Sequence, residues 1–109
     1  MPKLVDYKLD WYNWRGTWEI HHPHLPGVAV EPDSKAWFEW LLSIPTSFHF
    51  KGMKGHFTAR KEQRGDATYW YAYLKKAGKL HKAYLGKTEE LTHDRLEEVA
   101  ARLKSRLGN

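Results

Sequence analysis

Three segments in the second half of the chain alternate between apolar and polar side chains, as β-strands with one buried face do. They run over about residues 55–64, 69–76 and 80–87, and short turns with glycine separate them. Connections this short join neighbouring antiparallel strands. The pattern therefore predicts a three-stranded meander, preceded by a short extended piece at Phe48–Lys51.

An apolar stripe at helical spacing predicts a helix at the end of the sequence, over about His93–Leu107. Thr92 is the expected N-cap, and Leu91 and Leu96 are spaced as a hydrophobic staple. The stripe consists of Leu96, Val99, Ala100, Leu103 and Leu107. We expect this stripe to pack on the apolar face of the predicted sheet.

Two further elements are predicted in the N-terminal half. A hairpin is expected from Leu9–Tyr12 and Thr17–Ile20, with Gly16 in its turn. A Trp-rich helix is expected over about Lys35–Ser43, because Trp37, Trp40, Leu41 and Ile44 share one helical face. The candidate caps of this helix are Asp33 and Ser34.

Together these elements predict an α+β fold in which a three-stranded antiparallel sheet packs on a C-terminal helix. The N-terminal hairpin and the Trp-rich helix are expected as an annex to that unit. A length of 109 residues suits a single domain over residues 1–109, of which 1–47 form the annex and 48–109 form the sheet and helix.

Composition excludes several classes of protein. The chain has no cysteine, so neither a disulfide framework nor a Cys-ligated zinc site is available. No apolar run approaches the ~18 residues that a membrane span needs, and residues 1–6 lack the apolar core of a signal peptide. We therefore expect a cytoplasmic protein that does not bind a membrane.

The positive charge of the chain is concentrated on the predicted strands. The net charge is +5, yet residues 48–88 hold ten Lys and Arg against two Asp and Glu. The residues before and after this segment carry slightly more acidic than basic side chains. Such a concentration points to a polyanionic partner, and a solvated basic face without a partner is the alternative.

Alternation along the strands sorts their side chains onto two faces. One face collects Phe57, Ala59, Trp70, Ala72, Leu74, Ala83 and Leu85, which suit docking of the C-terminal helix. The opposite face collects Thr58, Arg60, Tyr71, Tyr73, Lys75, Lys82 and Tyr84. Because Arg and Lys pair with phosphates and base edges, and Tyr stacks on bases, these are the predicted nucleic-acid-binding residues.

The Trp-rich N-terminal half leaves a second arrangement open. Its hairpin and helix could cover the tyrosine-rich face as the second layer of a sandwich. Binding would then move to strand edges and turns, where Lys54, Lys76, Lys79 and Lys87 lie.

Two resemblances add expectations. The run Tyr69–Tyr73, followed by Tyr84-Leu85-Gly86 and an apolar helix, resembles the three-strand-plus-helix DNA-binding domains of integrase arms and plant ethylene-response factors. In those families the sheet enters the major groove. The resemblance implies that Arg60, Tyr73, Lys75, Lys82 and Tyr84 face DNA.

The second resemblance covers more of the chain. Trp37–Leu41, Thr46–Phe50 and Phe57–Glu62 resemble the amino-terminal region of large LuxR/MalT-like regulators of Chloroflexi. In those proteins the segment precedes an ATPase and a helical repeat region. The resemblance implies a bacterial protein in a regulatory context and supports the element boundaries.

Other chemistry finds little support in the sequence. His21, His22 and His24 stand near Glu19, and all are ligand types for a divalent metal. In a loop with prolines we expect them to be surface histidines, with no metal and no cofactor bound. The sequence also lacks a Gly-rich phosphate loop, a nucleophile elbow and a His-Glu-x-x-His motif, so we do not expect an enzyme.

The sequence therefore favours a domain that reads duplex DNA with the basic, Tyr-rich face of its sheet, in a regulatory or mobile-element context. Trp and Tyr side chains are also typical of protein interfaces, so the first alternative is a protein-interaction module that uses the Trp-rich half. Stacked tyrosines suit single-stranded DNA or RNA equally well, which is the second alternative.

Overall fold

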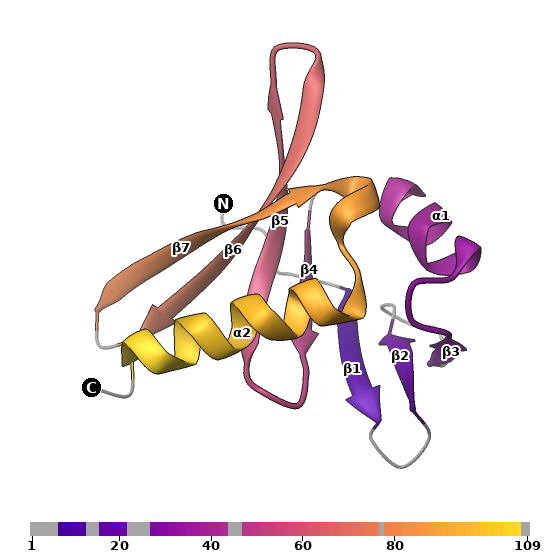
Figure 1. The fold of residues 1–109 in the computed structure, drawn as a ribbon, viewed down its shortest axis with the longest axis horizontal. Helices are drawn as coiled ribbons and strands as arrows, with labels where there is room; N and C mark the ends of the chain where they lie inside the picture. Colours follow the sequence, from indigo (N-terminus) through magenta and orange to yellow (C-terminus); the bar gives the residue numbers. More distant parts are fainter. Residues whose placement is uncertain (1–6, 13–15, 22–26, 44–46, 77, 108–109) are drawn as a thin grey trace.

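The strands form one sheet, and the helices lie beside it. The computed structural model describes residues 7–12, 16–21, 27–43, 47–76 and 78–107. The strands are β1 (Lys8–Tyr12), β2 (Thr17–His21), β3 (Val28–Val30), β4 (Ser47–Lys51), β5 (His56–Arg64), β6 (Ala67–Lys76) and β7 (Lys79–Lys87). The helices are α1 (Lys35–Ser43), the 3-10 turn η1 (Thr88–Glu90) and α2 (His93–Leu107). Within the described residues, the sheet has seven strands in the order β3-β2-β1-β4-β5-β6-β7, and Figure 1 shows their arrangement.

The prediction of a three-stranded antiparallel sheet is wrong. The N-terminal hairpin is part of the same sheet and extends it, instead of forming an annex. β5, β6 and β7 do form an antiparallel meander, but β4 pairs with β5 and, in parallel, with β1. The parallel pair aligns Lys8 with His49 and Asp10 with Lys51. A hairpin is signalled by turn residues next to both strands, whereas a parallel pair is joined by a long crossover that leaves no local signal.

The elements that the sequence predicts lie close to their predicted positions, whereas β3 and η1 are not among them. β1 and β2 form the expected antiparallel hairpin, in which Leu9 is opposite Ile20. α1 and α2 have the bounds that the apolar spacing predicts, and the fold remains α+β. Among the described residues, no helix is long and apolar enough to cross a membrane.

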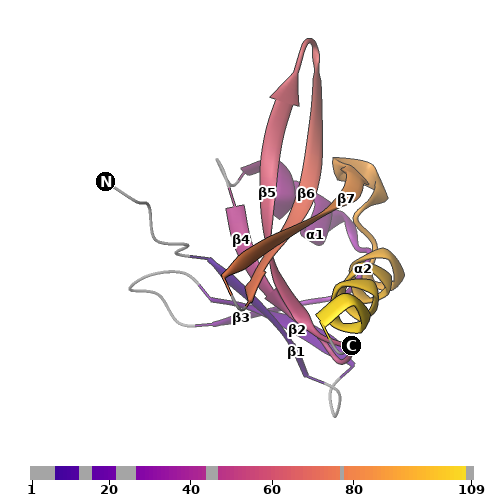
Figure 2. The same ribbon diagram turned by 90° about the vertical axis from the view of Figure 1, so that its left-hand side faces the viewer.

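α1 and α2 pack on the same face of the sheet (Figure 2). The apolar members of the alternating strands point to that face. In the α2 stripe, Leu96, Val99 and Leu103 are fully buried, and the side chain of Leu107 lies outside the described residues. The core also contains Leu9, Trp18, Ile20, Phe48, Phe50, Phe57, Ala59, Trp70, Ala72 and Leu85. The sheet face opposite the two helices, which carries the alternate polar residues, is called the open face below.

Tryptophans join the N-terminal half to the segment before α2. The rings of Trp18 on β2 and Trp37 on α1 lie 4.3 Å apart between centroids. Trp37 Nε1 donates a buried hydrogen bond of 2.7 Å to the carbonyl oxygen of Leu91. Trp70 Nε1 donates to Thr88 Oγ1 at 3.0 Å. The indoles of Trp37 and Trp70 therefore serve both as core volume and as hydrogen-bond donors that fix the connection to α2.

The two candidate caps of α1 serve different helices. Ser34 caps α1, because its Oγ accepts a hydrogen bond of 3.2 Å from the amide of Trp37. Asp33, with a φ of 61°, instead turns its carboxylate toward α2, and its Oδ1 accepts a 2.7 Å bond from the amide of His93. Thr92 is the N-cap of α2 as expected, since its Oγ1 accepts from the amide of Arg95 at 3.3 Å.

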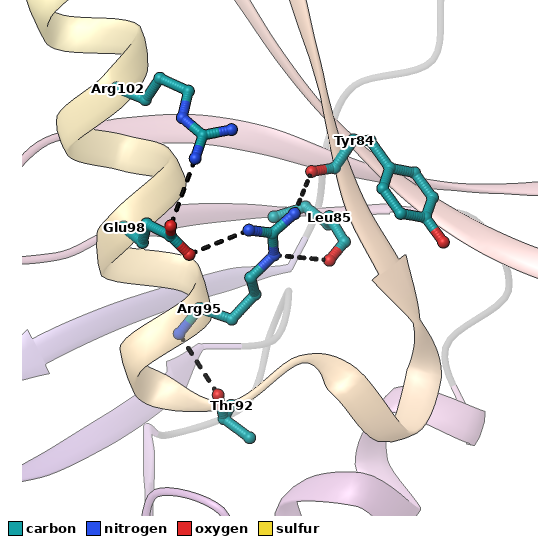
Figure 3. A network of polar contacts seen from close by, with 6 residues as sticks. All are labelled: Tyr84, Leu85, Thr92, Arg95, Glu98 and Arg102. Carbon is teal, nitrogen blue, oxygen red and sulfur yellow. Dashed lines mark hydrogen bonds and ion pairs between the residues drawn. The ribbon is translucent and has the colours of Figure 1, made fainter.

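α2 is also fastened to the edge strand β7 through Arg95 (Figure 3). Its Nη2 donates to the carbonyl oxygen of Tyr84 and its Nε to that of Leu85, each at 2.9 Å. The pairing of β6 and β7 shifts register here, which leaves Leu85 as the extra residue of a bulge. Glu98 holds the guanidinium from the other side, at 2.9 Å.

Candidate nucleic-acid interface

All seven predicted binding residues lie on the open face of the sheet. The register aligns Thr58 with Tyr73 and Lys82 in one row, and Arg60 with Tyr71 and Tyr84 in the next. Lys75 lies farther along β6, opposite Leu80. Alternation along the strands therefore assigns these side chains to one face correctly, and their role in binding stays a prediction.

The arrangement in which the N-terminal half covers this face is wrong for the described residues. β1 and β2 extend the sheet sideways, and α1 packs on the opposite face (Figure 2). Arg60, Lys75, Lys82 and Tyr84 are exposed, and Thr58, Tyr71 and Tyr73 are half-buried. Four lysines at strand edges and turns would be the expected binding residues if this face were covered. Of these, Lys54, Lys79 and Lys87 are also exposed, and the side chain of Lys76 lies outside the described residues.

The β5–β6 hairpin projects beyond its neighbours (Figure 1). The pairing of β5 with β4 ends at Arg60, and the pairing of β6 with β7 ends at Tyr69. In the described part of the chain, residues 63–68 therefore form a two-stranded ribbon without a third strand beside it. Gly65 at its tip has a φ of 61°, which suits the first central residue of a tight hairpin turn.

The ammonium group of Lys82 lies between two tyrosine rings of β6. Its Nζ is 4.4 Å from the ring centroid of Tyr71 and 5.4 Å from that of Tyr73. The guanidinium carbon of Arg60 is 5.4 Å from the Tyr73 ring, and that of Arg64 is 5.4 Å from the Tyr71 ring. Each such contact is worth about 0.5–1 kcal/mol at an exposed site. These five residues are called the cation–aromatic cluster below.

The carboxylate of Glu62 contacts this cluster. Its Oε1 is 3.5 Å from Arg64 Nη2 and 3.7 Å from Lys82 Nζ, and its Oε2 accepts a hydrogen bond from the Tyr73 hydroxyl. That hydrogen bond, followed by the charges of Lys82 and Arg64, lowers the pKa of Glu62 below its ordinary value. Glu62 is therefore ionised at neutral pH and offsets part of the positive charge of the cluster.

Tyr84 extends the cluster and Thr58 lies at its margin. The Tyr84 ring is 5.5 Å from that of Tyr71 between centroids, which is close enough for an edge-to-face contact. Thr58 Oγ1 lies 3.3 Å from His49 Nδ1 on β4. The structure thus brings Arg60, Tyr71, Tyr73, Lys82 and Tyr84 together, and places Thr58 and Lys75 at the two sides of this group.

Two members of the site are absent from the sequence-based prediction. Glu62 and Arg64 follow Arg60 at intervals of two residues, so alternation along β5 places them on the same face. The predicted first strand already ends at residue 64, and β5 ends there as well, followed by a turn at Gly65 and Asp66. Glu62 carries the wrong charge for a nucleic-acid surface, and only the contacts described above identify its part in the site.

Lys61, by contrast, adds to the charge excess of the sequence but not to the open face. Its Nζ lies 5.3 Å from the Trp70 ring and donates to the carbonyl oxygen of Leu41 at 3.2 Å. Burial lowers the pKa of Lys61 below its ordinary value. This lysine therefore joins α1 to β5 on the helical side of the sheet.

Histidines continue the open face toward β2. In register, Lys8 on β1 lies between His21 and His49. The rings of His49 and His56 are 5.9 Å apart between centroids. Burial lowers the pKa of His49 below 6.5, and the nearby His56 lowers it further. His49 is therefore neutral at pH 7.

The histidine-rich loop after β2 is described only at its start. His21 Nε2 lies 3.5 Å from Asp10 Oδ2 and 3.2 Å from Glu19 Oε1. His22 and His24 lie outside the described residues. Among the residues that are described, no three His, Asp or Glu side chains converge as metal ligands.

A scan against models of protein families finds no match to this chain, and searches of curated proteins and of solved structures find none either. The resemblances to LuxR/MalT-like regulators and to three-strand-plus-helix DNA-binding domains therefore stay predictions.

Proposed function

We propose that this chain is a DNA-binding domain and that the cation–aromatic cluster binds the backbone of duplex DNA. The observation that carries the proposal is the Lys82 ammonium held between Tyr71 and Tyr73, at 4.4 and 5.4 Å from their ring centroids. A fixed cation is a ready partner for a phosphate, and the neighbouring hydroxyls and rings add hydrogen bonding and stacking.

The distribution of charge supports the same partner. Residues 48–88 contain ten Lys and Arg against two Asp and Glu. On the open face, Arg60, Arg64, Lys75 and Lys82 lie on β5, β6 and β7. Several cations on one surface attract a polyanion from a distance and release counterions from DNA on contact.

The projecting ribbon of residues 63–68 favours duplex DNA over a flat partner surface. The major groove is about 12 Å wide and admits a two-stranded β-ribbon, whereas a sheet of seven strands is much wider. Insertion of the ribbon brings its tip, at Gly65, to the base edges, while the Arg64 side chain stays folded back against the Tyr71 ring of the cluster. Arg60 and Lys82, at the base of the ribbon, then lie beside the phosphates.

The interaction-module alternative depends on exposed tryptophans, which are common interface anchors. Trp18, Trp37 and Trp70 are fully buried in the core, Trp11 and Trp40 pack against it, and Trp14 lies outside the described residues. These side chains therefore stabilise the fold and offer little surface to a partner. This observation favours the nucleic-acid proposal over the alternative.

The experiment that tests the proposal is a fluorescence-anisotropy titration of labelled random duplex DNA, single-stranded DNA and duplex RNA. Each is measured with the full chain at about 50 and 200 mM salt, a range over which multi-phosphate contacts weaken strongly. We expect salt-sensitive binding that is tightest for duplex DNA.

Two results would contradict the proposal. Tighter binding of single-stranded DNA or of RNA moves the function to the second alternative, in which the tyrosines stack on unpaired bases. If none of the three probes bound at low salt, the basic face would be a solvated surface without a nucleic-acid partner.

A further inference from the structure

Three groups that suit an oxyanion converge on the Glu62 carboxylate. Arg64 Nη2 and Lys82 Nζ lie 3.5 and 3.7 Å from its Oε1, and the Tyr73 hydroxyl donates to its Oε2. The three come from β5, β7 and β6, so pairing of the strands assembles the arrangement. Guanidinium, ammonium and phenol hydroxyl are also the groups that proteins use to bind a phosphate.

We propose that Glu62 occupies a phosphate-binding site and that its carboxylate holds the place of a backbone phosphate until nucleic acid binds. Arg64, Lys82 and Tyr73 are the groups that bind the phosphate after Glu62 leaves. That the ligand is nucleic acid rests on the proposed function. The site itself requires only a phosphate oxyanion.

The position of Glu62 makes its departure easy. Its side chain is 27% exposed, and its partners Lys82 and Arg64 are 42% and 57% exposed. Exposed ion pairs are weak in water, because solvent screens both charges. Rotation of the Glu62 side chain toward solvent leaves the three donors facing an empty position of the right charge.

The internal carboxylate has two effects on the free protein. It keeps Lys82 and Arg64 oriented toward one point, so that the site exists before the ligand arrives. It also makes every phosphate compete with Glu62, which lowers affinity for phosphates in general. Removal of the Glu62 charge is therefore expected to strengthen binding, a change opposite to that of most site substitutions.

The first arm of the test uses inorganic phosphate at constant ionic strength, followed by the amide NMR signals of the folded chain. In Glu62→Ala we expect saturable shifts at residues 62–64, 71–73 and 82, with little response in the wild type. The double variant Glu62→Ala/Lys82→Ala is expected to lose these shifts. Equal responses of the wild type and Glu62→Ala would overturn the inference.

The second arm uses labelled duplex DNA and the milder variant Glu62→Gln, which keeps an acceptor for Tyr73. We expect it to bind roughly tenfold more tightly at about 0.1 M salt, with a steeper salt dependence that corresponds to one added phosphate contact. The matched control is Glu19→Gln, which makes the same change of charge on the open face at β2. If Glu62→Gln and Glu19→Gln gained the same affinity for duplex DNA, the loss of one negative charge would explain the change, and the inference would be overturned.

The two arms separate the inference from the proposed function. If no variant binds duplex DNA but Glu62→Ala binds phosphate at these residues, the DNA-binding proposal fails and the phosphate site stands. If the wild type binds duplex DNA and Glu62→Gln gains no more than Glu19→Gln, the proposed function stands and the inference fails.

Discussion

The guanidinium of Arg95 on α2 donates a 2.9 Å hydrogen bond to the carbonyl oxygen of Tyr84 on β7. The ring of Tyr84 lies on the open face, against Tyr71 of the cation–aromatic cluster. The backbone of Tyr84 is therefore bonded to α2, while its side chain contributes to the proposed binding face. Stability of α2 and geometry of the proposed site are connected through this contact.

Replacement of Arg95 by Ala is expected to destabilise the fold. The substitution removes bonds to the carbonyl oxygens of Tyr84 and Leu85 and to Glu98. A hydrogen bond to a charged group contributes about 1.5–3 kcal/mol. Because the Arg95 side chain is partly exposed and water replaces some of the lost bonds, we expect the free energy of unfolding to fall by about 2 kcal/mol. Urea denaturation followed by circular dichroism measures it.

Arg102→Ala is the matched control for that experiment. Arg102 lies on the same helix and contacts Glu98 at 3.2 Å in an exposed ion pair. Such pairs contribute about 0–1 kcal/mol. Equal losses in the two variants would show that the bonds from Arg95 to β7 add nothing beyond helix-surface charge.

Loss of Lys82 is expected to weaken DNA binding more than loss of a lysine on the other face. Lys82→Ala removes the cation between Tyr71 and Tyr73, and we expect a cost of about 1–3 kcal/mol and a salt slope smaller by about one unit. Arg60→Ala is expected to behave similarly. Lys104→Ala, an exposed site on α2, makes the same change of charge away from the site and serves as the control in the anisotropy titration. Unchanged affinity in both Lys82→Ala and Arg60→Ala would rule out this face as the interface.

Asp33 is expected to stabilise the protein through a helix other than its neighbour. Its carboxylate accepts from the amide of His93 at the start of α2, so Asp33→Ala loses a cap and places alanine at a φ of 61°. We expect a loss of about 2 kcal/mol in unfolding free energy.

Two companion variants separate the causes of that loss. Asp33→Asn keeps an acceptor oxygen and is expected to retain most of the stability, while Asp33→Gly relieves the backbone and isolates the loss of the cap. Thermal or urea unfolding compares the three. A full loss in Asp33→Asn would mean that the bond to His93 does not stabilise the protein.

His49 is expected to make the protein less stable in mild acid. Burial, and then the charge of His56, lower the pKa of folded His49 below 6.5. The unfolded chain therefore takes up the proton first, and stability falls as pH drops from above 6.5 through the lowered pKa. His49→Gln removes this contribution, so its unfolding free energy is expected to fall less than that of the wild type between pH 7.5 and 5. Urea titrations at each pH measure the unfolding free energy of both proteins. If it fell by the same amount in the wild type and in His49→Gln, His49 would not be the source of the acid sensitivity.

Local patterns predict most elements of the fold, though not β3 or η1, and do not predict the partners of the strands. Apolar spacing places α1 and α2, and alternation assigns the faces of β5, β6 and β7, because these signals act within a few residues. The pairing of β1 with β4 joins Lys8 to His49 across the whole of β2, β3 and α1. It depends on which apolar faces can share one core, and no local pattern records that choice.

The same limit applies to the site. Alternation finds Tyr71, Tyr73 and Lys82 because each faces away from the core. Glu62 is not the register partner of Tyr73, which lies opposite Thr58, and their hydrogen bond depends on how far each side chain leans along its strand. Such contacts follow from side-chain rotamers in the assembled sheet, which the order of residues does not express.

The parallel pairing of β1 and β4 has a consequence for the order of assembly. In the described part of the chain, three aligned positions, from Lys8 opposite His49 to Asp10 opposite Lys51, and a bond from the His49 amide to the Tyr7 carbonyl oxygen join the N-terminal strands to the rest of the sheet. β4 to β7 connect through short turns, whereas this junction requires closure of a long loop, which is slow and entropically costly. We therefore expect the chain to fold in two stages, with the tyrosine-bearing meander formed early and the junction closed last. Amide hydrogens along that junction are then the first to exchange when the native protein opens.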